Sequence, residues 1–356
     1  MDESPQPPFV VGLDAGGTRI RAYLGDASGR ELGCGHGGPG NALSVPRPEL
    51  VRNVAAALDA AVPRALRGQV AAVAGGFAGS GDEADQADQV DRVDQVDQVD
   101  GADGVGGRSE EETSGGGHGA VAAAVAEALA ATGIGGARVA VYGDADIVLA
   151  SAPGAPADGL ILIAGTGAIA ARVAGRRRVR CVDGDGWLLG DAGSAFWLGR
   201  EALRTTLRAV DGRGPWTALT RRILEAVAPG TPAAAPPGSW AERGRIRNRI
   251  ATWAYSRPPV TLATLSPIVA AAADEGDASA HALLDAAADE LAASVVALEP
   301  SPGELLAMTG GLAGPDGPLR TRVTARAEAM GLRVAAVRDG GAGALALARL
   351  LTHPRH

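Results

Sequence analysis

Near its start the chain reads Val10-Val11-Gly12-Leu13-Asp14-Ala15-Gly16-Gly17-Thr18-Arg19. An apolar run followed by a carboxylate, two glycines, a hydroxyl and a cation is typical of a strand, a tight turn and a second strand. Because glycine has no side chain, Gly16 and Gly17 let backbone N–H groups approach a phosphate, and Asp14 could hold a hydrated Mg²⁺ beside it. The same residues also suit an ordinary hairpin connection, so this stretch alone leaves both interpretations open.

Length and composition narrow the classes of protein to which the chain can belong. A chain of 356 residues exceeds the usual size of a single core and predicts two domains. Hydrophobic residues make up 46% of the chain and aromatic residues only 3%, so the core must be built from Ala, Val and Leu. No apolar run approaches the roughly 18 residues that span a bilayer, and residues 1–8 lack a signal-like pattern, which predicts a soluble, cytoplasmic protein.

The net charge of −8 is unevenly distributed. Twelve acidic residues and two arginines lie in residues 81–118, so the rest of the chain carries a net charge of +2. This balance indicates neither a nucleic-acid surface nor a basic membrane patch. Lysine is absent, which excludes a P-loop and Schiff-base chemistry. Cys34 and Cys181 lie far apart without CxxC partners, so neither a disulfide framework nor a cysteine metal site is predicted.

Two parts of the chain show the same order of elements. In the first we expect a meander of three strands, then helix, strand, helix and strand, over residues 9–14, 20–25, 30–35, 47–66, 69–74, 120–132 and 138–142. In the second we expect three strands, a helix, a strand, a helix, a strand and a helix, over residues 160–164, 168–173, 177–182, from about 194, 305–308, 318–330, 332–337 and 343–351. A duplicated α/β unit with a glycine turn after the first strand of each copy would clamp a nucleotide between two lobes.

The domain boundaries follow from this duplication. We place an N-terminal lobe at residues 1–143 and a C-terminal lobe at residues 144–356, with the last helix returning toward the N-terminal lobe. From Asp82 to Asp103 aspartate recurs about every three positions, which fits neither a helix nor a strand, so we expect a disordered acidic insert at about 81–118 without the pattern of an EF-hand calcium loop. A helical insertion is expected at about 210–300.

The glycine motifs at residues 14–18, 165–167 and 310–311 carry a family resemblance. The chain resembles the sugar kinases of the actin, Hsp70 and hexokinase superfamily, and most closely the BadF/BadG/BcrA/BcrD type that includes N-acetylglucosamine kinase. The most specific piece is Gly186-Trp187-Leu188-Leu189-Gly190-Asp191-Ala192-Gly193-Ser194. The resemblance implies an α/β, two-lobed, duplicated ribonuclease H-like fold with mixed sheets.

The resemblance also implies cofactors and site residues. The cofactors are ATP and Mg²⁺, with Asp14 holding the metal through water. The nucleotide would be bound by Asp14, Gly16, Gly17, Thr18, Arg19, Gly165, Thr166, Gly167, Gly310 and Gly311. The sugar would be bound by Asn41, Asp144, Gly186 and Asp191. Asp144 matches the catalytic base, since a carboxylate at a strand end can accept the proton of a primary hydroxyl that attacks the γ-phosphate.

Other roles for these residues stay open. Asp144 and Asp146 suit turn or helix-capping positions, Asp191 could cap the helix that begins near Ser194, and Asn41 suits a loop. Two positions depart from the family motif, because Asp185 stands where it usually has tryptophan and Ala192 where it has glutamate. These departures leave the choice of sugar open.

The expected function is phosphorylation of the 6-hydroxyl of an amino sugar, N-acetylglucosamine first, with glucosamine or another hexose as alternatives. An ATPase activator of an iron–sulfur dehydratase is a second alternative, for which no suitable cysteine pair is evident, and a non-catalytic sugar sensor is a third. Gly165-x-Gly167-x-x-Ala170 also matches a dinucleotide-binding fingerprint, but that motif must open a long helix where the pattern here predicts a hairpin. The expected partner is a small sugar, neither nucleic acid nor membrane, and a homodimer is one option for the oligomeric state.

Overall fold

The chain divides into two compact units, Met1–Ala155 together with Gly340–His356, and Pro156–Asp339. The structure, a computed structural model, describes residues 9–80 and 117–352, so all but the last two positions of the expected acidic insert lie outside the described residues. The division differs from the expected boundary at 143/144. Helix α4 (Asp144–Ala150) belongs to the first unit because it packs against β4 and α12 of that unit.

The first unit is built on a mixed five-stranded sheet with the order β3-β2-β1-β4-β5. Its first three strands form an antiparallel meander, and β4 and β5 run parallel to β1. The strands are β1 (Phe9–Ala15), β2 (Ile20–Gly25), β3 (Glu31–Gly37), β4 (Val70–Phe77) and β5 (Arg138–Gly143). The helices are α1 (Arg47–Ala61), η1 (Arg64–Gln69), α3 (Gly117–Thr132), α4 and α12 (Gly341–Thr352).

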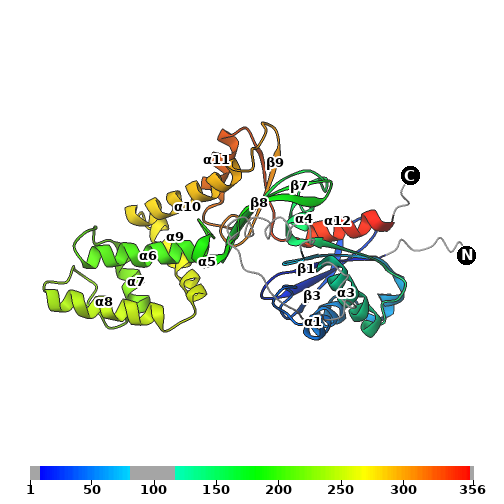
Figure 1. Ribbon diagram of the computed structural model, residues 1–356, viewed down its shortest axis with the longest axis horizontal. Helices are drawn as coiled ribbons and strands as arrows, with labels where there is room; N and C mark the ends of the chain where they lie inside the picture. Colours follow the sequence, from blue (N-terminus) through cyan, green and yellow to red (C-terminus); the bar gives the residue numbers. More distant parts are fainter. Residues whose placement is uncertain (1–8, 81–116, 353–356) are drawn as a thin grey trace, which may run out of the picture. The chain divides into compact units, whose positions relative to one another are not determined.

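Strand β1 is buried on both faces, because helices cover both sides of the sheet (Figure 1). Val11, Leu13 and Ala15 contribute to the core under α1 and α3, whereas Val10 contributes to the core under α4 and α12. This is the two-residue period of a strand. Gly12 lies directly beneath α12, since a Cβ there would lie 2.7 Å from the backbone nitrogen of Leu345.

The helix expected over residues 47–66 ends earlier, at Ala61. Val62 has extended backbone with φ −113° and ψ 105°, and Pro63 then precedes the 3₁₀ helix η1. Proline disfavours the helical conformation of the preceding residue and has no N–H to donate, so it ends the helix here.

The second unit repeats the topology of the first. Its five-stranded sheet has the order β10-β9-β6-β7-β8, in which β6, β7 and β8 form the meander and β9 and β10 run parallel to β6. The strands are β6 (Gly159–Ala164), β7 (Ala168–Ala174), β8 (Arg177–Asp183), β9 (Leu305–Thr309) and β10 (Arg333–Ala336). The duplicated mixed α/β fold expected from the sequence is therefore confirmed.

Most helices of the second unit lie between β8 and β9 in the chain. They are α5 (Gly186–Leu189), α6 (Ala195–Val210), α7 (Ala218–Val227), α8 (Trp240–Tyr255), η2 (Pro259–Leu265), α9 (Ser266–Asp274) and α10 (Ala278–Val296), followed by α11 (Arg320–Ala329) between β9 and β10. Figure 1 shows α6 to α9 gathered into a helical region, with α10 leading back to the sheet. Of the helices in residues 9–80 and 117–352, none combines the length and the apolar character needed to cross a membrane.

Asp277 joins two helices of this region. It caps α10 by accepting the N–H of Ala280 at 3.0 Å, and its other oxygen accepts the N–H of Leu219, in the first turn of α7, at 2.8 Å. Its side chain is buried. Burial by itself raises the pKa of this carboxyl, but the hydrogen bonds from the backbone N–H groups of Leu219 and Ala280 outweigh it, so the pKa lies below its ordinary value.

Because the pKa of Asp277 is lowered in the folded state, its contribution to the free energy of unfolding is present above the unfolded pKa of about 4 and is lost as the pH falls through the folded value. Asp277→Asn is therefore expected to lower the free energy of unfolding by about 1–2 kcal/mol at pH 7 and by less at pH 3. Urea denaturation at both values measures this. The exposed Asp274→Asn is the control, and equal losses at the two pH values would contradict the prediction.

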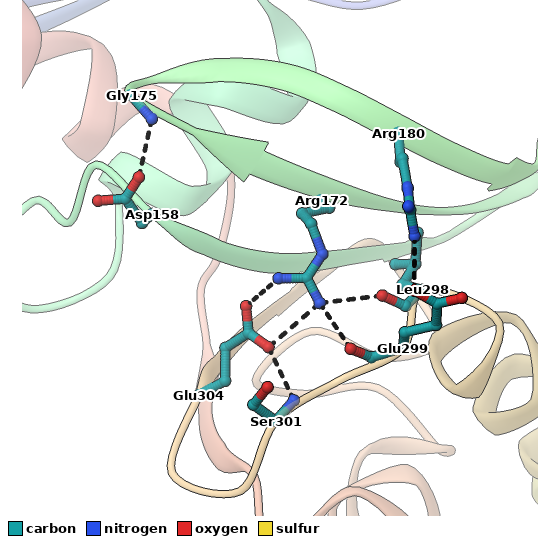
Figure 2. A network of polar contacts seen from close by, with 8 residues as sticks. All are labelled: Asp158, Arg172, Gly175, Arg180, Leu298, Glu299, Ser301 and Glu304. Carbon is teal, nitrogen blue, oxygen red and sulfur yellow. Dashed lines mark hydrogen bonds and ion pairs between the residues drawn. The ribbon is translucent and has the colours of Figure 1, made fainter.

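Arg172 on β7 ties the sheet of the second unit to the loop between α10 and β9 (Figure 2). It forms an ion pair with Glu304, and its Nη2 donates to the carbonyls of Leu298 and Glu299 at 2.9 and 3.0 Å. Oε2 of Glu304 also accepts the N–H of Ser301 at 3.1 Å. The ion pair is largely buried, with 25% of the Arg172 side chain and 16% of the Glu304 side chain exposed.

Arg172→Ala is expected to lower the free energy of unfolding by about 2 kcal/mol, because it leaves a largely buried carboxylate and two carbonyls without their donor. The matched control is Arg180→Ala on the neighbouring strand. Arg180 pairs with Glu299 at 3.0 Å, but the two side chains are 56% and 79% exposed, so its loss should cost less than about 0.5 kcal/mol. Urea denaturation compares the variants, and a similar cost for both would refute the importance of the Arg172 contacts.

Candidate functional site

The first glycine turn joins β1 to β2 at one edge of its sheet. The N–H of Gly16 donates to the carbonyl of Arg19 at 3.1 Å and closes the turn, while Gly17, Thr18 and Arg19 are exposed. Within the described part of the chain, no acceptor takes the N–H of Gly17 or Thr18. A Cβ added at Gly17 would meet nothing within 4 Å. The tip of the turn can therefore present backbone N–H groups to an anion.

Asp14 lies near the end of β1, opposite Arg21 on β2. Nη1 of Arg21 donates to Oδ2 of Asp14 at 3.2 Å, and 15% of the Asp14 side chain is exposed. Among residues 9–80 and 117–352, no group of three or more His, Cys, Asp and Glu side chains could hold a metal ion. Mg²⁺ commonly takes one or two carboxylates and completes its shell with water and phosphate oxygens. A single carboxylate beside a turn that can present N–H groups to an anion fits that mode of binding.

Asn41 lies on the loop beside the first turn. The N–H of Gly40 donates to the carbonyl of Gly16 at 3.0 Å and ties this loop to the turn. Oδ1 of Asn41 accepts the N–H of Leu43 at 2.9 Å, which is an Asx turn. Asn41 therefore has the structural role in its loop that the sequence left open. The residue is half-buried and lies next to the turn, so it also stays a candidate for sugar binding.

A segment that the sequence did not single out links these parts. Directly after β4, the N–H of Ala78 donates to the carbonyl of Ala15 at 2.9 Å, and the carbonyl of Ala78 accepts the N–H of Ala42 at the same distance. The buried Ser80 hydroxyl lies between two carbonyls and shares its proton with them, that of Phe77 at 2.8 Å and that of Tyr142, near the end of β5, at 3.2 Å. This segment therefore holds the end of β1, the Asn41 loop and the end of β5 together.

Asp144 follows β5 directly. The parallel strands β1, β4 and β5 are neighbours, with Ala15 opposite Phe77 and Phe77 opposite Gly143, so their carboxyl ends meet at one edge. The backbones of β1 and β5 are separated by two strand spacings, roughly 10 Å, because β4 lies between them. The structure thus brings Asp14, the first turn and Asp144 to the same edge of the sheet.

The two carboxylates at the start of α4 make different contacts. Oδ2 of Asp146 accepts the N–H of Gly143 at 2.9 Å, so Asp146 has the capping role that the sequence allowed for either residue. Oδ1 of Asp144 accepts the N–H of Ala145 at 2.8 Å. Asp146 is buried, whereas Asp144 is half-buried at the edge of the sheet.

The second glycine turn joins β6 to β7. The N–H of Gly165 donates to the carbonyl of Gly167 at 2.9 Å. The carbonyls of Gly165 and Thr166 accept the N–H groups of Ala195 and Phe196 at 2.8 and 3.2 Å, so the turn lies against the start of α6. After the turn the chain continues as strand β7, not as the helix that a dinucleotide-binding fingerprint requires.

Gly310 and Gly311 follow β9, the parallel neighbour of β6. Gly310 has φ +96°, and a Cβ there would lie 2.2 Å from the carbonyl oxygen of Ala164, which accepts the N–H of Leu312. A Cβ on Gly165 would lie 3.9 Å from the backbone nitrogen of Gly311. The structure therefore brings the second turn and this glycine pair together within the second unit.

Asp191 packs against the second turn. Its Oδ1 accepts the N–H of Ala168 at 3.0 Å, and a Cβ at Gly167 would lie 2.5 Å from that oxygen. The alternative role of Asp191 as the side-chain cap of α6 is wrong, because the hydroxyl of Ser194 accepts the N–H of Trp197 at 3.1 Å. Asp191 instead connects the loop before α6 to the first residue of β7.

The pKa of Asp191 lies above its ordinary value. Burial is the largest cause, and the negative charges of Asp183 and Asp185 raise it further, while the hydrogen bond from Ala168 acts in the opposite direction. A raised folded-state pKa means that the free energy of unfolding decreases as the pH rises through that pKa. A ligand hydroxyl that donates to this carboxylate would favour the ionised form and lower the pKa.

Asp183 is a residue that the sequence analysis missed. Its carboxylate accepts the N–H groups of Gly184, Asp191 and Ala192, and so closes the loop that carries Asp191. Gly186, in the same loop, has φ +81° and begins the short helix α5. The only sequence signal for Asp183 is that aspartate favours turns, since two of its partners lie eight and nine residues away.

Comparisons with known proteins agree with this geometry. A model of the BadF/BadG/BcrA/BcrD ATPase family matches residues 11–330. An N-acetyl-D-glucosamine kinase of Dictyostelium discoideum is 39% identical over 87 residues, which cover 24% of this chain and 27% of that protein. The match thus spans about a quarter of the relative's length.

Solved structures share the whole fold. A candidate N-acetylglucosamine kinase from Porphyromonas gingivalis gives a TM-score of 0.64 at 18% identity, covering 97% of this chain and 100% of that chain. A second, from Chromobacterium violaceum, gives a TM-score of 0.60 at 23% identity, covering 96% and 99%. At these identities the likeness shows the fold.

Proposed function

This chain belongs to the BadF/BadG/BcrA/BcrD ATPase family, and from that premise we propose that it is an ATP-dependent kinase that phosphorylates the 6-hydroxyl of an amino sugar. The proposed substrate is N-acetylglucosamine first and glucosamine second. The observation that carries the proposal is the position of Asp144, directly after β5 and at the same sheet edge as the first glycine turn. The partial match to an N-acetyl-D-glucosamine kinase supports the choice of sugar.

The nucleotide contacts are assigned to the two turns and the glycine pair. When bound, ATP supplies the phosphoryl group and Mg²⁺ neutralises its charge. In the first unit, phosphate contacts come from Gly16, Gly17, Thr18 and Arg19, with Asp14 holding Mg²⁺ through water. In the second unit, contacts come from Gly165, Thr166, Gly167, Gly310 and Gly311. The exposed N–H groups at the tip of the first turn support this assignment.

The sugar contacts are assigned to Asn41, Asp144, Gly186 and Asp191. Asp144 would accept the proton of the 6-hydroxyl as that oxygen attacks, which is general-base catalysis. Asp191 and Asn41 would bind other hydroxyls or the 2-substituent. Sites that pair buried polar groups with substrate hydroxyls discriminate strongly against sugars that lack them. These side chains would therefore decide which sugar is accepted.

The test is ADP release with Mg²⁺ and ATP across a panel of hexoses and amino sugars, with phosphorus NMR to identify the phosphorylated position. The expected result is turnover that depends on N-acetylglucosamine and yields the 6-phosphate, with a lower kcat/KM for glucosamine. ATP turnover that does not depend on any sugar would refute the proposal. Sugar binding without turnover, measured by calorimetry, would favour a sensor. Because the reaction uses ATP, we place it in the cytoplasm.

A further inference from the structure

One aspartate side chain closes the loop that carries Asp191. Oδ1 of Asp183 accepts the N–H of Gly184 at 2.7 Å and the N–H of Asp191 at 2.6 Å, and Oδ2 accepts the N–H of Ala192 at 2.8 Å. Gly190 makes room for this carboxylate, because a Cβ there would lie 2.3 Å from Oδ1 of Asp183. The carboxylate therefore occupies a small nest of N–H groups formed by its own loop.

These hydrogen bonds hold an unfavourable backbone conformation. Asp183 has φ +65° and Asp191 has φ +57°, both in the left-handed region that residues other than glycine adopt at a cost. Hydrogen bonds to an ionised acceptor are stronger than those between neutral groups, so the Asp183 carboxylate can offset that cost. Without it, Asp191 is free to relax toward a more common backbone conformation.

A continuous set of contacts leads from Asp183 to the second glycine turn. The carboxylate of Asp183 accepts the backbone N–H of Asp191, and the carboxylate of Asp191 accepts the N–H of Ala168 at 3.0 Å. Ala168 directly follows Gly167, whose carbonyl closes the turn by accepting the N–H of Gly165. A change at Asp183 is thus transmitted to the proposed sugar-binding carboxylate and to the proposed phosphate turn.

We propose that Asp183 is a positioning residue that fixes Asp191 for sugar binding and couples the sugar-binding loop to the second glycine turn. This inference rests on the proposed function, because the sugar-binding role of Asp191 does. It makes no claim that Asp183 contacts the sugar or the nucleotide. Its effect is expected on substrate affinity more than on the chemical step.

Two substitutions at Asp183 are expected to raise the KM for the sugar to different extents. Asp183→Ala removes both acceptor oxygens and with them all three hydrogen bonds, and it is expected to raise the KM for the sugar more than tenfold, with kcat reduced less than threefold. Asp183→Asn keeps Oδ1 but turns an amide nitrogen toward the N–H of Ala192, so it should raise KM by an intermediate factor. This graded series remains informative if the alanine variant folds poorly.

The matched control is Asp185→Asn. Asp185 is exposed on the same loop, and its side chain makes no cap hydrogen bond at the start of α5. Like Asp183, it places a negative charge near Asp191. The control therefore removes a comparable charge without removing the hydrogen bonds, and it should change KM by less than twofold. A KM as high as that of Asp183→Asn would assign the effect to charge and overturn the inference.

Hydrogen–deuterium exchange of peptides covering residues 184–192 gives a readout that does not need activity. Exchange is expected to be faster in Asp183→Ala and unchanged in Asp185→Asn. Unchanged exchange in Asp183→Ala, or faster exchange with an unaltered KM, would overturn the proposal. If the unsubstituted protein turns over no sugar while Asp183→Ala still exchanges faster, the proposed function fails and the positioning of the loop by Asp183 stands.

Discussion

Asp144→Asn is expected to lower kcat for sugar phosphorylation by about 10²- to 10⁴-fold, the usual contribution of a general base. Asparagine keeps the size and one acceptor oxygen of the side chain, so the contact to Ala145 can persist. What is lost is the ability to accept the proton of the attacking hydroxyl. KM for the sugar should change far less than kcat, and the free energy of unfolding should stay within about 1 kcal/mol of the unsubstituted protein.

The matched control for this prediction lies two residues away. Asp146 is buried and caps the start of α4 by accepting the N–H of Gly143. Asp146→Asn should therefore lower the free energy of unfolding, while sugar-dependent turnover of the folded protein persists. Coupled ADP-release kinetics and urea denaturation on both variants separate the two effects. Sugar-dependent turnover that survives in Asp144→Asn would remove Asp144 from the role of base.

The second large effect is expected from Gly310→Ala. A Cβ at this position would lie 2.2 Å from the oxygen and 2.5 Å from the carbon of the Ala164 carbonyl, and the residue has φ +96°. The colliding atoms belong to the backbone of the central strand β6, so they cannot move aside as a flexible side chain would. Steric overlap and backbone strain together should lower the free energy of unfolding by at least about 3 kcal/mol.

Gly311→Ala is the control for the stability of Gly310→Ala. A Cβ at Gly311 would meet nothing within 4 Å, so this variant should change the free energy of unfolding by less than about 1 kcal/mol. Thermal and urea denaturation of the two neighbours provide the comparison. Equal stability of the two variants would show that β9 can shift away from β6 without cost, contrary to the prediction.

Much of the fold could be predicted because it is encoded locally. The strand over Ile20–Gly25 has the expected bounds, and β1, β6 and β7 differ from expectation by only one residue at one end. Alternating or continuous apolar residues and glycine turns act over a few positions, so a single stretch contains the whole signal. The repeated order of elements then predicted the repeated sheet topology.

Only part of the candidate site could be predicted from the sequence. Both glycine turns can be recognised from spacing, and Asp144 was singled out by the family resemblance at the end of an expected strand. The role of Asp183 and that of the segment after β4 were not. The segment after β4 depends on contacts such as Ala78 to Ala15 and Ser80 to Tyr142, which join residues 62 or more positions apart. The role of Asp183 depends on N–H groups eight and nine residues away, whose position is set by the backbone conformation of the loop.

By itself, the sequence determined the two copies of the α/β pattern, the positions of both glycine turns and the family, because each rests on short-range spacing of residue types. The sequence also led us to expect that the last helix, α12, returns to the first unit, as it does. Only the tertiary structure decided that α4 belongs to the first unit, that Ser194 rather than Asp191 caps α6, and that one carboxylate holds the loop around Asp191. Gly343 donates to Ser151 across 192 positions, and Arg138 to Leu351 across 213. Such contacts form only once packing has brought distant segments together, so no local pattern can contain them.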